Sequence, residues 1–175
     1  MSTSTAPLVR PATAADMAAV TQIYAHEVLH GLATFEETPP DEAEMTSRFD
    51  ALRAGGFPYL VAEIDGVVMG YAYAGPYRVR PAYRHSIESS VYVDAAARGR
   101  GVGRALLAAL VAACEDKEWS QMVAVIGNSE NHGSIQLHAG RGFHLTGTLQ
   151  AVGFKLGQWV DTVIMQRALR NTLDK

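Results

Sequence analysis

One segment, residues 91–104, constrains the fold more than any other part of the chain. It begins with the strand-forming run Val-Tyr-Val, passes through the turn Asp-Ala-Ala-Ala, and continues as Arg-Gly-Arg-Gly-Val-Gly-Arg into a helix-forming stretch rich in Ala and Leu. Alternate glycines let backbone approach a ligand closely, and a helix N-terminus presents unpaired N–H groups with a partial positive charge. This strand–turn–helix order therefore predicts a phosphate-binding site within a mixed α/β fold.

Two familiar glycine motifs are absent from this segment. The dinucleotide fingerprint needs a third glycine three residues after the second, and the nucleotide P-loop needs Gly-Lys followed by Ser or Thr. Neither pattern occurs between residues 98 and 106. The anion that this loop binds is therefore expected to belong to a different class of ligand.

The charge distribution also points to a small anion. Residues 76–104 contain six arginines and two acidic residues, a local charge of +4, whereas the whole chain carries −3. A nucleic-acid footprint usually makes the entire domain basic, so this local cluster favours a small anionic ligand and argues against nucleic acid. A solvated charged face is the alternative explanation.

Hydrophobic periodicity predicts mixed α and β structure in a single domain, residues 1–175, with its core at about 8–169. Helices are expected from the Thr13–Asp16 capping box to about Val28, from Asp41 to Gly55, over Val102–Glu118 and over Ser134–Arg141. Strands are expected over Leu8–Pro11, Tyr59–Ile64, Val67–Ala74, Ser86–Val93, Met122–Ile126, Phe143–Phe154 and Trp159–Ala168, with an Asp65-Gly66 hairpin turn.

The composition predicts a cytoplasmic protein. The longest uninterrupted apolar run, residues 105–114, is far shorter than the roughly 18 residues that a membrane-spanning helix needs. The first residues are polar and lack the basic and apolar regions of a secretory signal. The single cysteine, Cys114, excludes an internal disulfide and any multi-cysteine zinc site, and its place on the apolar face of the helix predicts burial.

Two motifs identify a family resemblance. Arg98-x-x-Gly101-x-Gly103 and the downstream Asn131-x-x-Ser134 pattern resemble the cofactor regions of the GCN5-related N-acetyltransferases (GNAT family), whose donor is acetyl-CoA. The resemblance implies an acyl-CoA N-acyltransferase fold, a twisted mixed sheet splayed between its fourth and fifth strands with helices on both faces. It also implies that the cofactor is held by Val91, Tyr92, Val93, Arg98, Gly99, Arg100, Gly101, Val102, Gly103, Arg104, Asn131 and Ser134.

Three further stretches, 33–36, 83–93 and 152–161, resemble the phosphinothricin and methionine sulfoximine acetyltransferase branch of that family. This implies acetylation of the α-amino group of a small amino-acid analogue, by direct attack in a ternary complex. Relatives are often homodimers, so a homodimer is expected here. The acceptor-binding residues implied are Phe35, Glu36, Arg78, Val79, Arg80, Glu88, Ser89 and Ser90.

Acetyl transfer to an amine needs a proton acceptor, because an ammonium group has no lone pair. The resemblance makes Glu88 this base, and an ordinary ion pair with Arg78 or Arg84 is the alternative. At the position where many relatives carry a tyrosine as general acid, this chain has His138. A histidine can donate a proton near neutral pH, but a structural role for His138 is an equal possibility, and the thiolate can also leave unassisted.

One motif competes with this interpretation. His26-Glu27-Val-Leu-His30 is a literal His-Glu-x-x-His sequence, which is typical of zinc peptidases. No third ligand on a following helix is apparent, and the predicted enzyme needs no metal. The sequence also remains compatible with an acetyltransferase for another small amine or amino acid, and with a non-catalytic acetyl-CoA sensor, which has no need of Glu88.

Overall fold

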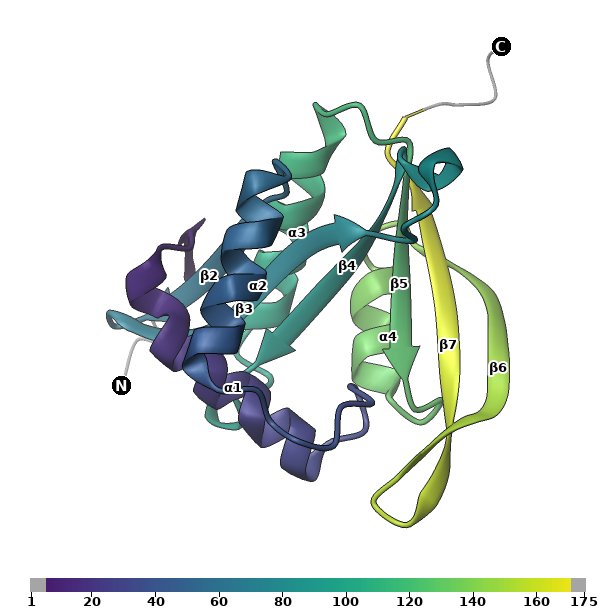
Figure 1. The fold of residues 1–175 in the computed structure, drawn as a ribbon, viewed down its shortest axis with the longest axis horizontal. Helices are drawn as coiled ribbons and strands as arrows, with labels where there is room; N and C mark the ends of the chain where they lie inside the picture. The colour runs from purple at the N-terminus through teal and green to yellow at the C-terminus, as the bar shows by residue number, and fades with distance from the viewer. Residues whose placement is uncertain (1–5, 171–175) are drawn as a thin grey trace.

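The computed structural model describes residues 6–170, which fold around one seven-stranded sheet (Figure 1). The strand order is β1-β2-β3-β4-β5-β7-β6. Every neighbouring pair is antiparallel except β4 and β5, which are parallel. The strands are β1 (Leu8–Pro11), β2 (Tyr59–Ile64), β3 (Val67–Pro76), β4 (Ser86–Val93), β5 (Gln121–Gly127), β6 (His144–Lys155) and β7 (Gln158–Ala168).

Helices cover both faces of the sheet (Figure 1). On one face, α1 (Met17–His30) and α2 (Glu42–Ala54) pack on a cluster of tyrosines from β2, β3 and β4. On the other face, α3 (Val102–Glu115) buries its apolar side against β1–β4, and α4 (His132–Ala139) packs beside it. The mixed α/β sheet with helices on both faces, as expected from the sequence, is confirmed.

The parallel pair β4–β5 separates partway along its length. The register runs from Ser86 opposite Gln121 to Ser89 opposite Ala124 and then ends, although β4 continues to Val93 and β5 to Gly127. Over residues 90–93, β4 pairs only with β3. The predicted splay between the fourth and fifth strands is therefore present, and it leaves one backbone edge of β4 without a sheet partner.

The predicted elements agree with the observed ones apart from their ends. The α4 helix begins at His132, two residues earlier than expected, because the Asn131 side chain caps it by accepting a hydrogen bond from the Ser134 N–H. The α3 helix ends at Glu115 instead of Glu118. No helix in the described part of the chain is long and apolar enough to cross a bilayer.

Candidate active site

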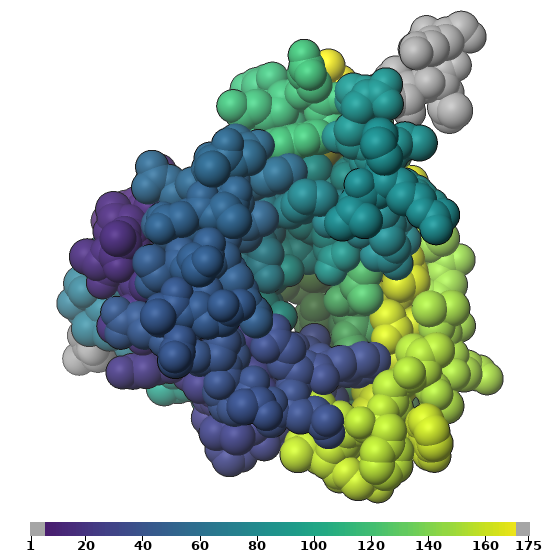
Figure 2. Space-filling view, in the orientation of Figure 1, coloured from purple at the N-terminus to yellow at the C-terminus, as the bar shows by residue number. Residues whose placement is uncertain are grey.

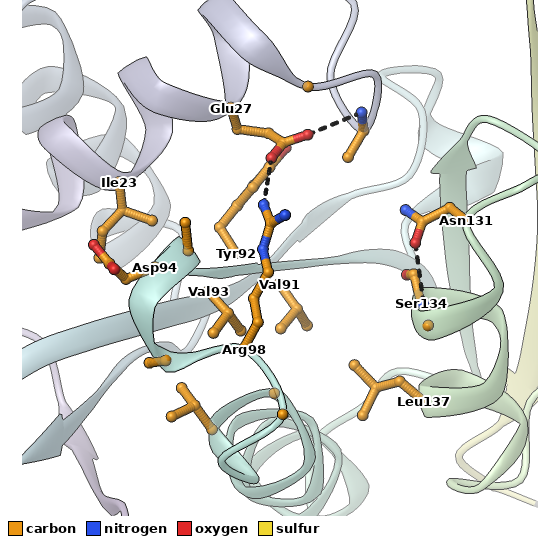
Figure 3. A pocket seen from close by; sticks show the side chains of 18 of the residues that line it. Ile23, Glu27, Val91, Tyr92, Val93, Asp94, Arg98, Asn131, Ser134 and Leu137 are labelled. Atoms are coloured by element: carbon orange, nitrogen blue, oxygen red, sulfur yellow. Dashed lines mark hydrogen bonds and ion pairs between the residues drawn. The ribbon is translucent and has the colours of Figure 1, made fainter.

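A groove of about 1560 Å³ runs along the splay (Figure 3). Its floor is the unpaired end of β4, residues 91–93, and one wall is the loop from Asp94 to Gly101 that leads into α3. The C-terminal half of α1 forms the opposite wall, and α4 closes the end with Asn131, Ser134 and Leu137. Three segments that are far apart in sequence therefore meet around one cavity.

The glycine loop has the backbone geometry that its sequence predicts. Gly99 and Gly101 have φ values of +77° and +83°, and a Cβ at either position would meet nothing within 4 Å. Both positions therefore need glycine for their left-handed conformation, and both leave open space beside the backbone. Gly101 is the N-cap of α3, so the N–H groups of the first turn of that helix point toward the groove without helical acceptors.

A second, smaller cavity of about 260 Å³ lies on the other side of the splay. It is lined by β4 residues Glu88–Tyr92, by the end of β5, and by Ala33, Thr34 and Phe35 of the 31–36 loop that follows α1. Figure 2 shows the surface hollowed where this early part of the chain approaches the central strands and the β6–β7 hairpin. The two cavities share Ala33, Val91, Tyr92, Gly127, Asn131 and Ser134.

Glu88 is the acidic residue among those that line the small cavity. Strand alternation places Glu88 on the same face of β4 as Ser90 and Tyr92, toward α1 and α2. Partial burial raises the pKa of Glu88 above its ordinary value, and the nearby positive charge of Arg78 opposes that rise. A carboxylate with a raised pKa beside a small cavity has the properties of a general base.

The structure brings together part of the predicted acceptor set. Phe35, Glu88, Ser89 and Ser90 line the small cavity. Glu36 lies outside the lining, where its carboxylate accepts hydrogen bonds from Arg48 at 2.6 Å and from the Tyr24 hydroxyl at 2.9 Å. The remaining predicted acceptor residues also lie outside the lining, and they are Arg78, Val79 and Arg80.

The Arg78–Arg80 segment is exposed. Val79 is 96% exposed, and the Arg78 guanidinium stacks on the Tyr77 ring at 4.2 Å. Arg78 nevertheless acts on the small cavity through its charge, which it exerts on Glu88.

The predicted cofactor residues coincide with the large groove almost completely. Arg100 is the exception, because it does not contribute to the lining although its neighbours Gly99 and Gly101 do. The lining also includes residues that the cofactor motifs did not indicate, among them Gln22 and Ile23 of α1, and Gly127 and Asn128 at the end of β5. No local pattern marks these positions, since the fold brings α1 and the end of β5 to the groove from distant parts of the chain.

His138 belongs to α4 and lines neither cavity. It is 4% exposed, its Nδ1 is 2.8 Å from the carbonyl oxygen of Ser134, and its ring packs edge-on against Phe143 at 5.0 Å. Burial lowers the pKa of His138, which favours the neutral imidazole. The geometry therefore supports the structural alternative for this residue and gives no support to the role of general acid.

The His-Glu-x-x-His segment also has a different environment from that of a metallopeptidase. His26 and His30 line the groove with ring centroids 4.9 Å apart, but the Glu27 carboxylate is engaged by Arg98 and by the backbone of Ala33. Within residues 6–170, no three His, Cys, Asp or Glu side chains are grouped to hold a metal ion. The Glu27 carboxylate thus links α1 to Arg98 of the glycine loop and to the backbone of Ala33.

The site combines splayed strands, a glycine loop at a helix N-terminus, and a carboxylate beside the point where the two cavities meet. This combination defines an acyltransferase that binds its acyl donor between two strands. The sequence comparison agrees with this class: the model of the acetyltransferase (GNAT) family matches residues 21–143. The chain belongs to the GNAT acetyltransferase family, as the glycine loop predicted.

Three relatives show how similar the chain is to known members of the family. It is 53% identical over 154 residues to a phosphinothricin N-acetyltransferase of Alcaligenes faecalis, covering 88% of this chain and 78% of the relative. It is 40% identical to an L-methionine sulfoximine/L-methionine sulfone acetyltransferase of Salmonella typhimurium, covering 92% and 94%. A phosphinothricin acetyltransferase from Sinorhizobium meliloti, solved in complex with acetyl-CoA, superposes with a TM-score of 0.94 at 47% identity, covering 98% and 93%.

Proposed function

We propose that this chain transfers the acetyl group of acetyl-CoA to the α-amino group of a small amino-acid analogue, by direct attack in a ternary complex. The observation that carries the proposal is the junction of the two cavities at Val91 and Tyr92. A thioester in the large groove and an amine in the small cavity meet beside the same stretch of β4. The names of the relatives support phosphinothricin, methionine sulfoximine and methionine sulfone as acceptors.

Acetyl-CoA supplies an activated thioester, and the residues of the large groove fit such a ligand. The open space beside Gly99 and Gly101 and the first turn of α3 suit a pyrophosphate, with Arg98 and Arg104 providing positive charge. The unpaired edge of residues 91–93 offers backbone groups for the pantetheine amides and the thioester carbonyl. Asn131 and Ser134 flank the same path.

Glu88 removes the proton from the acceptor amine in this proposal. Its carboxylate lines the small cavity, and its raised pKa brings its basicity closer to that of the amine it must deprotonate. Phe35, Ser89 and Ser90 hold the acceptor in place, and Arg78 adds positive charge for an acceptor carboxylate. The size of the small cavity favours a free amino acid over a folded protein substrate.

We also infer that the chain acts as a single domain and as a homodimer in the cytoplasm. The β6–β7 hairpin lies at the edge of the sheet and carries large apolar side chains that are 53% to 68% exposed. Such an edge is typical of a surface that another chain covers. The exposed apolar side chains of this hairpin are Leu145, Leu149, Val152, Phe154, Leu156 and Trp159. Light scattering of the purified protein tests whether it is a dimer.

The proposed reaction is tested by thiol release from acetyl-CoA with a panel of amines. The panel contains phosphinothricin, methionine sulfoximine, methionine sulfone, ordinary amino acids, polyamines and a peptide. Turnover of the first three with little on polyamines or peptide is the expected result. Acetyl-CoA binding without turnover of any amine would instead support a non-catalytic sensor. Bound zinc in the same sample would support a zinc hydrolase.

A further inference from the structure

Glu27 lines the large groove and uses both of its carboxylate oxygens (Figure 3). One oxygen, Oε1, accepts a hydrogen bond of 3.2 Å from the backbone N–H of Ala33. The other, Oε2, is 3.2 Å from Nη2 of Arg98 across the groove. The glutamate therefore joins the 31–36 loop, which lines the small cavity, to the arginine that begins the glycine loop.

The backbone around Glu27 is shaped to admit this side chain. A Cβ on Gly31 would lie 1.7 Å from Glu27 Oε1, so only glycine at position 31 lets the carboxylate reach the loop. The Glu27 side chain is 13% exposed, whereas the Arg98 side chain is 60% exposed. The carboxylate is thus the buried partner of the pair, and the arginine is the solvent-exposed one.

The 31–36 loop rests on the ends of the sheet. Lys155 Nζ donates a 2.7 Å hydrogen bond to the Thr34 carbonyl, and a Cβ on Gly127 would lie 2.2 Å from the Leu32 carbonyl oxygen. These contacts fix the loop on the side of β5 and β6. The Ala33 hydrogen bond to Glu27 fixes it on the side of α1, between the two cavities that Ala33 itself lines.

We infer that Glu27 is a positioning residue for both substrates. It positions the 31–36 loop for the acceptor, and it pairs with Arg98 until an anion bound in the groove replaces the carboxylate as the partner of that arginine. This inference rests on the proposed function and adds a residue to it. Since an exposed ion pair with Arg98 contributes little, the pyrophosphate competes easily for the guanidinium. The negative charge of Glu27, which faces the same groove, opposes the charge of the incoming cofactor.

Two substitutions separate the two functions of the carboxylate. Glu27→Gln removes the charge but keeps a carbonyl oxygen for the Ala33 N–H, whereas Glu27→Ala removes both. The control is Glu118→Gln, which removes the same charge from an exposed turn after α3, outside both cavities. Alanine and glutamine are both good helix formers, so α1 is expected to persist, and thermal melting verifies this.

Calorimetry with acetyl-CoA tests the charge. Both Glu27 variants are expected to bind acetyl-CoA about threefold to tenfold more tightly than the unaltered protein, because a repelling carboxylate and a competitor for Arg98 are gone. The Glu118 variant is expected to bind as the unaltered protein does. Unchanged or weaker binding in both Glu27 variants would overturn the inference that Glu27 competes for Arg98.

Hydrogen exchange at residues 31–36 and the acceptor KM test the hydrogen bond. Glu27→Ala is expected to speed exchange of the Ala33 amide and to raise the acceptor KM about tenfold. For Glu27→Gln, both the exchange rate and the acceptor KM are expected to stay within about threefold of those of the unaltered protein. Slow exchange and an unchanged KM in Glu27→Ala would overturn the loop function. The proposed function fails separately, if the unaltered protein binds no acetyl-CoA.

Discussion

Ser89 and Ala124 are the last two residues in register between β4 and β5. Glu88 lies immediately before this point on β4. Residues 90–93 lie immediately after it, and their backbone has no sheet partner on the side of β5. The proton acceptor and the backbone donors of the proposed reaction thus follow one another along a single strand. Substitutions on the two sides of Ser89 are therefore expected to affect acceptor chemistry and donor binding separately.

Glu88→Gln is expected to lower kcat by at least ~100-fold, because a general base contributes about that much or more to proton transfer. Acetyl-CoA binding, measured by calorimetry, is expected to remain, since Glu88 lines only the small cavity. Glu118→Gln serves as the matched control for loss of one carboxylate. Turnover by the glutamine variant at the unaltered rate would remove Glu88 from the mechanism.

The dependence of kcat/KM on pH follows from the raised pKa of Glu88. A base acts when it is deprotonated, so activity is expected to fall as the pH drops through this pKa, which lies above that of an ordinary glutamate. Arg78→Met removes the charge that opposes the rise, so the acidic limb of the profile is expected to move to higher pH. An acidic limb that does not move would show that the charge of Arg78 does not affect the pKa of Glu88.

Arg104 lines the groove and Arg100 does not. Arg104→Ala is therefore expected to raise the KM for acetyl-CoA by about fivefold to tenfold, as loss of one charge-assisted contact to a phosphate does. Arg100→Ala is expected to have the smaller effect. Raising the salt concentration should reduce the difference between the unaltered protein and the Arg104 variant, because screening weakens the same contact. Equal effects of the two variants would contradict this assignment.

Gly127→Ala is expected to destabilise the protein by about 1–3 kcal/mol, since overpacking against backbone costs this much. The added Cβ would lie 2.2 Å from the Leu32 carbonyl oxygen and could be accommodated only by moving the 31–36 loop. Gly147→Ala in β6 is the control, because its Cβ would meet nothing within 4 Å. Urea unfolding measures both free energies, and equal stability of the two variants would contradict the close packing at Gly127.

Cys114 is expected to be unreactive in the folded protein. It is fully buried among the apolar residues of α3, and burial raises the pKa of its thiol to about 12, so almost no thiolate exists near neutral pH. A thiol-specific disulfide reagent should therefore report only the released CoA thiol during assays. Addition of denaturant should release one protein thiol per chain, and rapid labelling before unfolding would show that Cys114 is accessible.

The parts of the fold that local patterns specify were predictable. The Asp65-Gly66 turn has positive φ values of 53° and 78° at its two central residues, as the sequence of a tight hairpin requires. The glycine loop followed in the same way from local spacing, and in both cases the determining residues are close together in the chain. The splay joins the distant strands β4 and β5, and it was expected from the family resemblance instead.

The environment of the 31–36 loop was not predictable from local patterns. Glu36 was expected to face the acceptor, but Arg48 and Tyr24 hold it away from the small cavity. Glu27 occurred in a motif typical of zinc enzymes, yet its partners are Arg98 and the backbone of Ala33. The partners of these glutamates come from distant segments, and the spacing of charged residues does not show which pairs will meet.

The division of the splay into two cavities has a consequence for the end of the reaction cycle. In the proposed reaction, the thiol product forms on the side of the glycine loop and the acetylated amine on the side of Phe35 and Glu88. With each product leaving through its own cavity, neither blocks the departure of the other. The enzyme therefore needs no obligatory order of release, and a rise in either product should inhibit mainly by competing with the substrate that shares its exit.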